Sequence, residues 1–192
     1  MPNQDRRQRQ LETARLTLRP WAPADAPALF RWARDPEVGP RAGWPPHVDV
    51  ADSARVIREV LGVPETYAIV LREGELAGEP VGSVGLMIGE ASSLARSGRE
   101  GEIGCWIARE LWRHGYVPEA CRSLVEHAFC DLRLDALWYG YYEGNAQSRR
   151  VAQKLGFVPH HVIEDDPRPF LGDVARTHAS VLTRERWERL GS

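Results

Sequence analysis

Residues 102–120, EIGCWIARELWRHGYVPEA, constrain the fold of this chain more than any other stretch, because they combine a strand, a loop and a helix. A β-prone segment, 102–108, precedes a short loop, and Gly115 opens a helix that should run to about Cys130. The helix carries apolar residues at 3/4 spacing on one face: Val117, Ala120, Cys121, Leu124, Ala128 and Phe129. The sequence therefore predicts a long amphipathic helix here.

The loop directly before this helix contains Arg113, His114 and Gly115. A helix N-terminus presents unpaired backbone N–H groups and the positive end of the helix dipole, which together bind phosphate without side-chain charge. Gly115 lets the backbone approach closely, while Arg113 and His114 add positive charge. These residues predict an anion site. The alternative is a tight turn with no ligand, since one glycine is not a phosphate-binding motif.

The composition fits one ordinary domain. At 192 residues the chain can bury a core, and 43% hydrophobic with 27% charged residues excludes whole-chain disorder and a collagen-like structure. The formal net charge of −2 gives no global field that would recruit nucleic acid or an anionic membrane. Any anion must therefore be held locally.

Cysteine usage and the polar start indicate a cytoplasmic protein. Cys105, Cys121 and Cys130 form no C-x-x-C pair, and their odd count argues against a disulfide framework. Residues 1–10 contain no apolar segment, and no apolar run in the chain reaches the length of a membrane span. We expect a flexible N-terminus over residues 1–10 and one domain over 11–192.

The order of elements predicts an α+β fold around a mixed sheet, because a meander of strands is interrupted by crossover helices. Strand patterns occur at 15–21, 67–72, 80–89, 102–108, 134–142, 157–163 and 174–182. Helix patterns occur at 23–34, after Asp49 or Asp52 to about residue 61, and at 115–130, 145–155 and 184–190.

A second polar group opens the helix at 145–155. Asn145 suits an N-cap, Ser148 lies at the third helical position, and Gly156 fits the position after the C-cap. Capping explains most of this pattern. The alternative is that Asn145 and Ser148 orient a ligand amide or protonate a leaving group.

Taken together and in this order, the two segments resemble the GCN5-related N-acetyltransferase (GNAT) superfamily, and specifically its ribosomal-protein-acetylating RimJ/RimL-like branch. The likeness extends over roughly residues 11–190. The residues that carry it are 15–20 (RLTLRP), 102–107 (EIGCWI), 112–120, Asn145 with Ser148, 154–157 (KLGF) and 182–187.

The resemblance implies the GNAT fold, with a mixed sheet of about six to seven strands, about four to five flanking helices, and a V-shaped splay between the fourth and fifth strands. It also implies acetyl-CoA as co-substrate in that splay, and no metal. The cofactor-binding residues would be Cys105, Trp106 and Ile107 for the pantetheine, Arg113, His114, Gly115, Tyr116 and Val117 for the pyrophosphate, Asn145 for the pantetheine arm, and Arg150 for the adenosine 3′-phosphate. Arg149 and Lys154 are alternatives to Arg150, and a solvated helix face is another.

The cofactor loop departs from the branch pattern W-G-x-G-Y-A/G-T-E-A. Arg113 stands in place of a glycine, Val117 in place of a small residue and Pro118 in place of threonine. A non-glycine residue resists a positive φ, and proline removes one N–H donor. We therefore expect a functional but slightly irregular loop with weaker CoA binding.

The resemblance implies direct attack of an amine on the thioester, with Glu102 as the candidate base and Glu100 behind it. Ser148 would act on the departing sulfur, because the position of the tyrosine that many relatives use is Ala152 here. Cys105 has no evident histidine partner that would make it a nucleophile. His160 and His161 are adjacent in a predicted strand, so their side chains should point to opposite faces. Together with His178 they therefore do not suggest a metal site.

The predicted activity is an N-acetyltransferase acting on a protein N-terminal α-amine or a small-molecule amine. The alternative is a non-catalytic acyl-CoA sensor of the same fold. We expect no nucleic-acid or membrane partner, and a homodimer stays open. The acceptor should depend on the Trp44 loop and on residues 157–173, where Glu164, Asp165 and Asp166 either attract a cationic amine or form a solvated turn.

Overall fold

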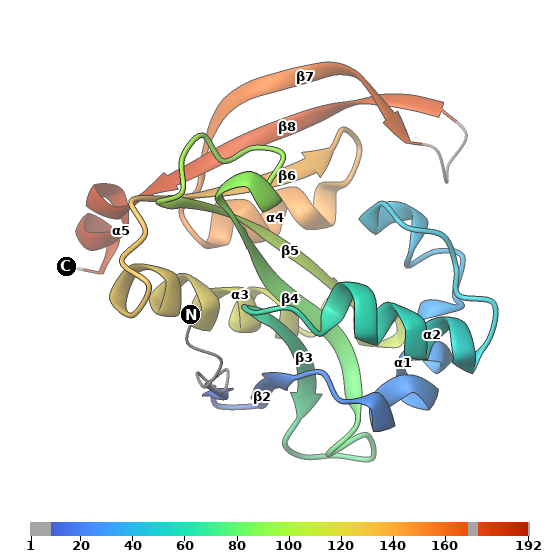
Figure 1. The fold of residues 1–192 in the computed structure, drawn as a ribbon. Helices are drawn as coiled ribbons and strands as arrows, with labels where there is room; N and C mark the ends of the chain where they lie inside the picture. Colours follow the sequence, from blue (N-terminus) through green and yellow to red (C-terminus); the bar gives the residue numbers. More distant parts are fainter. Residues whose placement is uncertain (1–8, 169–172, 192) are drawn as a thin grey trace, which may run out of the picture.

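The computed structural model describes residues 9–168 and 173–191, and within them the chain forms one eight-stranded sheet in the order β1-β2-β3-β4-β5-β6-β8-β7 (Figure 1). The strands are β1 (Leu11–Glu12), β2 (Leu16–Pro20), β3 (Thr66–Leu71), β4 (Pro80–Ile88), β5 (Glu100–Ile107), β6 (Ala136–Tyr142), β7 (Val158–Arg168) and β8 (Asp173–Thr183). Neighbours pair antiparallel except β5 and β6, which pair parallel. The predicted mixed sheet is confirmed.

Helices cover both faces of the sheet (Figure 1). They are α1 (Ala26–Ala33), α2 (Val50–Val56) with a π-helical extension (Ile57–Leu61), α3 (Tyr116–Cys130), α4 (Ala146–Lys154) and α5 (Arg184–Leu190). One face packs on α1 and α2, and the other on α3 and α4. Of the two residues that the sequence offered as the start of this helix, Asp49 and Asp52, it is Asp49 that caps α2, by accepting from the backbone N–H of Asp52 at 2.7 Å. None of these helices, within the described residues, is long and apolar enough to cross a membrane.

The parallel pair β5–β6 is short, and this opens the sheet. The paired residues are Glu100–Glu102 on β5 and Ala136–Trp138 on β6, and the pairing goes no further. Beyond that point β5 stays paired with β4 as far as Ile107, and β6 stays paired with β8 as far as Tyr142. The two strands therefore diverge, which confirms the predicted splay between 102–108 and 134–142.

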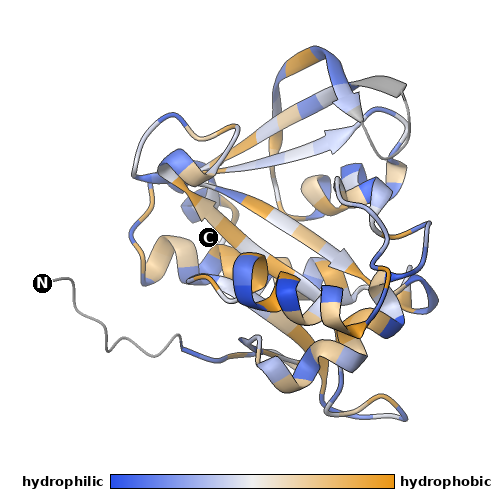
Figure 2. Cartoon of the chain, turned by 45° about the vertical axis from the view of Figure 1, so that its right-hand side comes forward, coloured by the Kyte–Doolittle hydropathy of each residue, from blue (hydrophilic) through white to orange (hydrophobic). Residues whose placement is uncertain are grey.

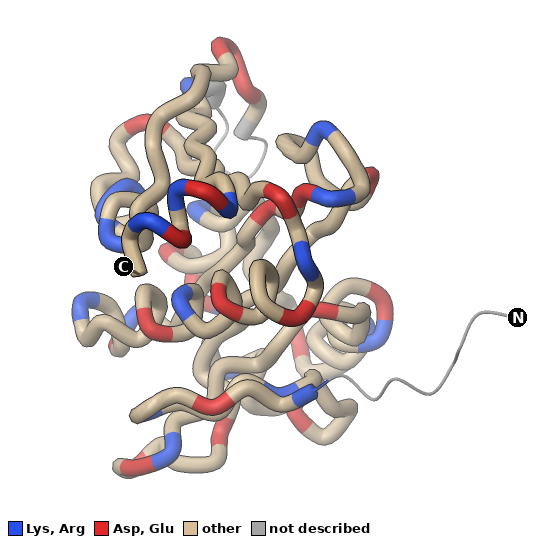
Figure 3. Tube along the Cα trace, turned by 90° about the vertical axis from the view of Figure 1, so that its left-hand side faces the viewer, with Lys and Arg blue, Asp and Glu red and all other residues tan. Residues whose placement is uncertain are grey.

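The apolar face of α3 forms the centre of the larger core. Ala120, Cys121, Leu124, Ala128 and Phe129 are fully buried against the sheet, as the 3/4 spacing predicts. Figure 2 shows the hydrophobic colour concentrated on the central strands of the sheet. Acidic and basic positions are interspersed along the chain (Figure 3), in keeping with a net charge of −2.

Three strands, β1, β7 and β8, differ from the sequence patterns. The short strand β1, which no pattern singled out, pairs with β2 through Leu11 and Glu12. The β7–β8 hairpin is longer than the patterns at 157–163 and 174–182, and it forms an arm that rises above the rest of the sheet (Figure 1). The expectation of a flexible start concerns residues 1–10, of which 1–8 lie outside the described residues.

The prediction that His160 and His161 point to opposite faces of their strand is wrong. A β-bulge between Pro159 and His161 breaks the alternation of β7, so the Nδ1 atoms of His160 and His161 lie 2.9 Å apart. Both rings also contact Trp138 edge-on. Even so, no group of three or more metal-binding side chains occurs in the part of the chain that the structure describes.

A charged network ties α3 to the residue before β3. Nε2 of His127 lies 2.9 Å from Oε2 of Glu65, and Nδ1 of His127 lies 2.8 Å from Oδ2 of Asp131. The Tyr67 hydroxyl donates to the same Glu65 oxygen at 2.9 Å. The Glu65 hydrogen bond, opposed by burial and helped by Asp131, raises the pKa of His127 above its ordinary 6.5.

The stability of the protein should therefore fall as the pH rises above about 6.5. Because the folded state holds the His127 proton more tightly than the unfolded state, this stabilisation is complete below pH 6.5 and is lost as the pH passes through the raised folded-state pKa. The free energy of unfolding should fall by up to about 1.4 kcal/mol per pH unit in that window. Urea unfolding at several pH values measures it. His127→Gln should remove this slope and His160→Gln should keep it; equal slopes in wild type and His127→Gln would contradict the assignment.

Candidate active site

A cavity of about 1040 Å³ passes through the β5–β6 splay, from the N-terminus of α3 to Glu102. It brings together most of the site residues expected from the sequence, while His114, Glu100 and Arg149 do not line it. The expected residues that line it are Glu102, Cys105, Trp106, Ile107, Arg113, Gly115, Tyr116, Val117, Asn145, Ser148 and Arg150. Residues that are far apart in the sequence thus line one continuous space.

The turn before α3 has the left-handed backbone that close approach to an anion requires. Gly115 is the N-cap, with φ of 81°, and Arg113 has φ of 69°. Arg113, which stands where the branch pattern has a glycine, thus adopts a left-handed conformation at a cost of about 1–2 kcal/mol. Pro118 lies in the first turn, where Tyr116 and Val117 have N–H groups without a partner inside the helix.

A brace from the N-terminal region holds this turn. Arg15 donates from Nη1 to the carbonyl oxygen of His114 at 3.0 Å and from Nε to Glu119 Oε2 at 2.7 Å. The other Glu119 oxygen accepts from the hydroxyl of Thr13 at 2.6 Å and from the backbone N–H of Arg15 at 2.9 Å. The Arg15 guanidinium also lies over the Tyr116 ring, 4.4 Å from its centroid.

Burial opposes the charge of Glu119, but the hydrogen bonds from Thr13 and Arg15 outweigh it and lower the pKa of this carboxyl. This brace was not predicted from the sequence. Arg15 and Glu119 both stand in the motifs that carry the family resemblance, but nothing in either motif says that the two side chains meet.

Glu102 lies at the point where β5 and β6 part. Its Oε2 accepts from the Ser92 hydroxyl at 2.8 Å, from the Ser93 N–H at 3.1 Å and from the Ser93 hydroxyl at 3.2 Å. The carboxylate is therefore oriented by the loop after β4. Its other oxygen would lie 3.8 Å from a Cβ at position 140, so Gly140 leaves the space beside Oε1 open.

Glu100, the second candidate base, is engaged elsewhere. Its Oε2 accepts from the Trp138 indole N–H at 2.6 Å and from the Arg96 N–H at 3.0 Å. The structure therefore distinguishes the two candidate bases, because Glu102 lines the cavity and Glu100 does not.

Ser148 joins a chain of hydrogen-bonding groups inside the splay. As predicted, Asn145 caps α4, because its Oδ1 accepts from the Ser148 N–H at 3.1 Å. The Ser148 hydroxyl donates to the Tyr139 hydroxyl at 3.1 Å, and Cys105 Sγ lies 3.4 Å from the same phenol oxygen. Tyr139 is 2% exposed, and burial raises the pKa of its phenol well above the ordinary range.

Tyr139 is the functional candidate that the sequence analysis missed. It stands in the aromatic stretch 134–142, whose alternation alone does not say which tyrosine faces the splay. The capping bond also limits what Asn145 can offer a ligand. Its side-chain oxygen accepts the Ser148 N–H, so a hydrogen bond to a ligand would come from its amide nitrogen.

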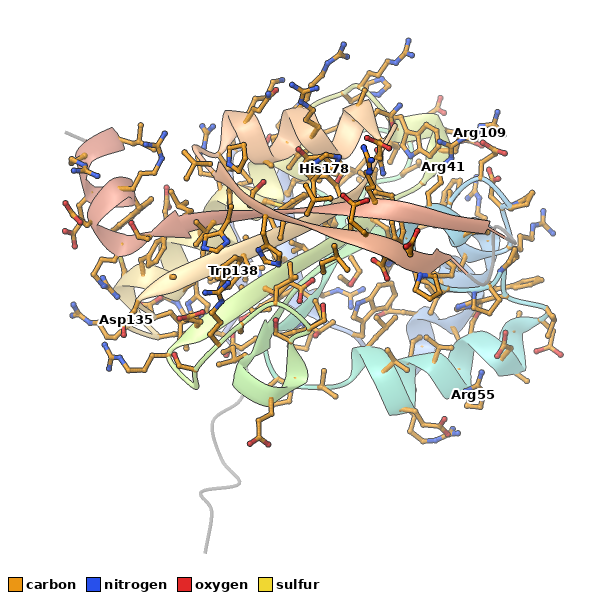
Figure 4. All side chains as sticks on the ribbon, turned by 90° about the horizontal axis from the view of Figure 1, so that it is seen from above. Arg41, Arg55, Arg109, Asp135, Trp138 and His178 are labelled. Carbon is orange, nitrogen blue, oxygen red and sulfur yellow. The ribbon has the colours of Figure 1, made fainter. Side chains whose placement is uncertain are left out.

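The basic residues of α4 divide between two cavities. Arg150 and Lys154 line the large cavity, whereas Arg149 lines a separate cavity of about 410 Å³ together with His178. Figure 4 shows His178 on the α4 side of the sheet and Trp138 on the opposite side. Arg149 is thereby the least suitable of the three for a group bound in the splay.

The acidic stretch near the β7–β8 arm is only partly available to a ligand. Glu164 forms an ion pair with Arg176 at 2.8 Å. Asp166 accepts from the Thr177 hydroxyl and lines the large cavity. Of the acidic residues expected there, Asp166 is therefore the one that contributes negative charge to the same space as Glu102.

The remaining β5 residues contribute their backbone N–H and C=O groups to the cavity. Since the pairing with β6 ends at Glu102, residues 103–107 present one edge of β5 to the cavity. The Trp106 ring packs edge-on against Trp44 at 5.5 Å, which links this strand to the loop between α1 and α2. An extended ligand could add to this strand edge by main-chain hydrogen bonds.

Comparison with known proteins gives a consistent result. A family model described as "Acetyltransferase (GNAT) domain" matches residues 15–158. The "Uncharacterized N-acetyltransferase YoaA" of Bacillus subtilis is 28% identical over 80% of this chain and 85% of its own length. The "Putative ribosomal N-acetyltransferase YdaF" of the same organism is 38% identical over a shorter stretch, 34% of this chain and 36% of that protein.

Among solved structures, a GCN5-related N-acetyltransferase from Brucella melitensis superposes with a TM-score of 0.77. The match covers 95% of this chain and 82% of that one, at 18% sequence identity. At this identity the likeness shows the fold.

Proposed function

This chain belongs to the GNAT acetyltransferase family, whose reaction transfers an acetyl group from acetyl-CoA to an amine, and on that premise we propose that its acceptor is an α-amine such as a protein N-terminus. The observation that carries the proposal is the single cavity that joins the anion-binding turn of α3 to Glu102 through the β5–β6 splay.

The residues around the splay fit acetyl-CoA. The positive φ of Gly115 exposes the turn before α3, where the backbone of residues 113–117 would contact the pyrophosphate. The free edge of residues 105–107 would pair with the pantetheine, and the Asn145 amide nitrogen would donate to its arm. Arg150, with Lys154 beside it in the cavity lining, would contact the adenosine 3′-phosphate. His114 would contribute through its backbone, since its carbonyl is held by Arg15.

In the chemical step Glu102 accepts the proton of the attacking nitrogen, and Ser148 hydrogen-bonds to the departing sulfur. An α-amine suits this arrangement. With a pKa of about 7.7–8.0 it is roughly one-tenth neutral at pH 7, whereas a lysine side chain with a pKa of about 10.4 is almost wholly protonated. The carboxylates of Glu102 and Asp166 in the cavity lining favour a cationic acceptor.

The RimJ/RimL-like motifs and the similarity to YdaF support an acceptor of ribosomal origin. The three free cysteines of this chain suit the reducing environment of the cytoplasm, where we propose that the protein acts. We also propose that residues 11–192 form a single domain. A homodimer stays a prediction.

Incubation with acetyl-CoA and peptides that carry a free α-amine should release CoA thiol in a protein-dependent manner. The same peptides with a blocked α-amine and a free lysine should react much more slowly. The thermal shift with CoA gives the second readout, because a ligand at 100 times its Kd adds about 2.7 kcal/mol to stability. Stabilisation by CoA with no turnover on any amine would favour the sensor alternative.

A further inference from the structure

The Tyr139 hydroxyl lies where three elements meet in the splay. Tyr139 comes from β6, Cys105 from β5 on the other side of the opening, and Ser148 from α4. The phenol oxygen is 3.1 Å from the Ser148 hydroxyl and 3.4 Å from Cys105 Sγ, and all three residues line the large cavity. A buried polar atom with this placement belongs to the site and not only to the core.

We propose that Tyr139 is a positioning residue that orients the Ser148 hydroxyl toward the departing sulfur of the acyl donor. This inference rests on the proposed acetyl transfer. It assigns a partner to Ser148, whose own hydroxyl would otherwise rotate freely about its Cβ–Oγ bond.

The surroundings of Tyr139 fix the phenol in place. Its ring packs against Phe157 with centroids 5.7 Å apart and belongs to the core that α3 covers. Burial raises the pKa of the phenol, so the hydroxyl keeps its proton throughout the neutral range. Cys105 is a weak hydrogen-bond partner, which leaves Ser148 as the stronger acceptor for that proton.

At the 3.1 Å distance between the Ser148 and Tyr139 hydroxyl oxygens, either hydroxyl can be the donor of the hydrogen bond. In the structure Ser148 donates to Tyr139. When the phenol donates instead, the Ser148 proton is released toward the cavity, and a hydroxyl that accepts one hydrogen bond donates a stronger one. The change needs only rotation of two hydroxyl hydrogens.

The step balances without net proton transfer from Tyr139. The amine nitrogen forms the new bond to the acyl carbon and loses its proton to Glu102. The carbon–sulfur bond breaks, and its electron pair stays on sulfur. A thiol with a pKa of about 8.5 leaves readily as thiolate near neutral pH, so a hydrogen bond from Ser148 stabilises it until solvent supplies a proton.

The test is a double-mutant cycle on turnover at saturating acetyl-CoA. Tyr139→Phe and Ser148→Ala should each lower kcat about tenfold, while the KM for acetyl-CoA stays within about twofold. The double variant should be no slower than Ser148→Ala, because both changes remove the same interaction. Thermal unfolding checks that each variant is folded.

Tyr67→Phe is the matched control. Tyr67 is also a fully buried tyrosine of the same core, but its hydroxyl donates to Glu65, away from the cavity. This variant should lose stability and keep kcat. If Tyr139→Phe keeps wild-type kcat, or if the two losses multiply in the double variant, the positioning role is overturned. Absence of turnover in the wild type with every amine overturns the proposed function and this inference with it.

Discussion

Replacing Glu102 with glutamine should lower kcat for an amine acceptor by about 10²- to 10³-fold, because a positioned general base contributes about 10²- to 10⁴-fold. Ser92 and Ser93 hold Oε2 of this carboxylate, and Gly140 leaves space beside Oε1. Glutamine keeps the shape of the side chain and can still accept hydrogen bonds, but it cannot take a proton. The Kd of acetyl-CoA, measured by calorimetry, should therefore stay unchanged.

Glu100→Gln is the control for this prediction. Glu100 lies two residues earlier on β5, and its carboxylate is bonded to Trp138 and Arg96 outside the cavity. The control should keep kcat within a few-fold of wild type. Equal losses in the two variants, or none in Glu102→Gln, would mean that Glu102 is not the base.

Replacing Glu119 with alanine should raise the Kd of acetyl-CoA by roughly 10- to 100-fold, as expected for the loss of charge-assisted hydrogen bonds of about 1.5–3 kcal/mol. The Glu119 carboxylate accepts hydrogen bonds from both Thr13 and Arg15, and Arg15 in turn donates to the His114 carbonyl. Without Glu119 the guanidinium is no longer fixed, so the turn that presents the α3 amides loses its support. At saturating acetyl-CoA, kcat should change much less.

Glu126→Ala controls for loss of an acidic residue from the same helix, because Glu126 is exposed and lies outside the brace and the cavity. Its Kd for acetyl-CoA should match wild type. An unchanged Kd in Glu119→Ala would show that the turn holds its shape without the brace.

The sequence predicted those parts of the site that depend on local order along the chain. The turn at Gly115 and the cap at Asn145 follow from residues within a few positions of one another, and both are confirmed. The splay between 102–108 and 134–142 came from the family resemblance. It depends on how far β5 and β6 stay paired, and periodicity carries no signal for that.

The features that the sequence did not reveal depend on contacts between distant residues or on strand register. Arg15 and Glu119 meet although they lie on different elements, and Tyr139 faces the splay because of the register of β6 with β8. Glu100 and Glu102 share one face of β5, and only Trp138 and the serine loop distinguish them. The histidine pair was misjudged because a bulge interrupts the alternation of β7.

In the proposed reaction, acetyl passes from CoA to an α-amine beside Glu102. The decisive measurement is tandem mass spectrometry of a peptide with one free α-amine and one lysine after incubation with acetyl-CoA. We expect acetylation at the α-nitrogen by the wild type and a loss of about 10²-fold or more in Glu102→Gln. Acetyl found only on the lysine side chain, or on neither amine while CoA still stabilises the protein, would overturn the proposed reaction.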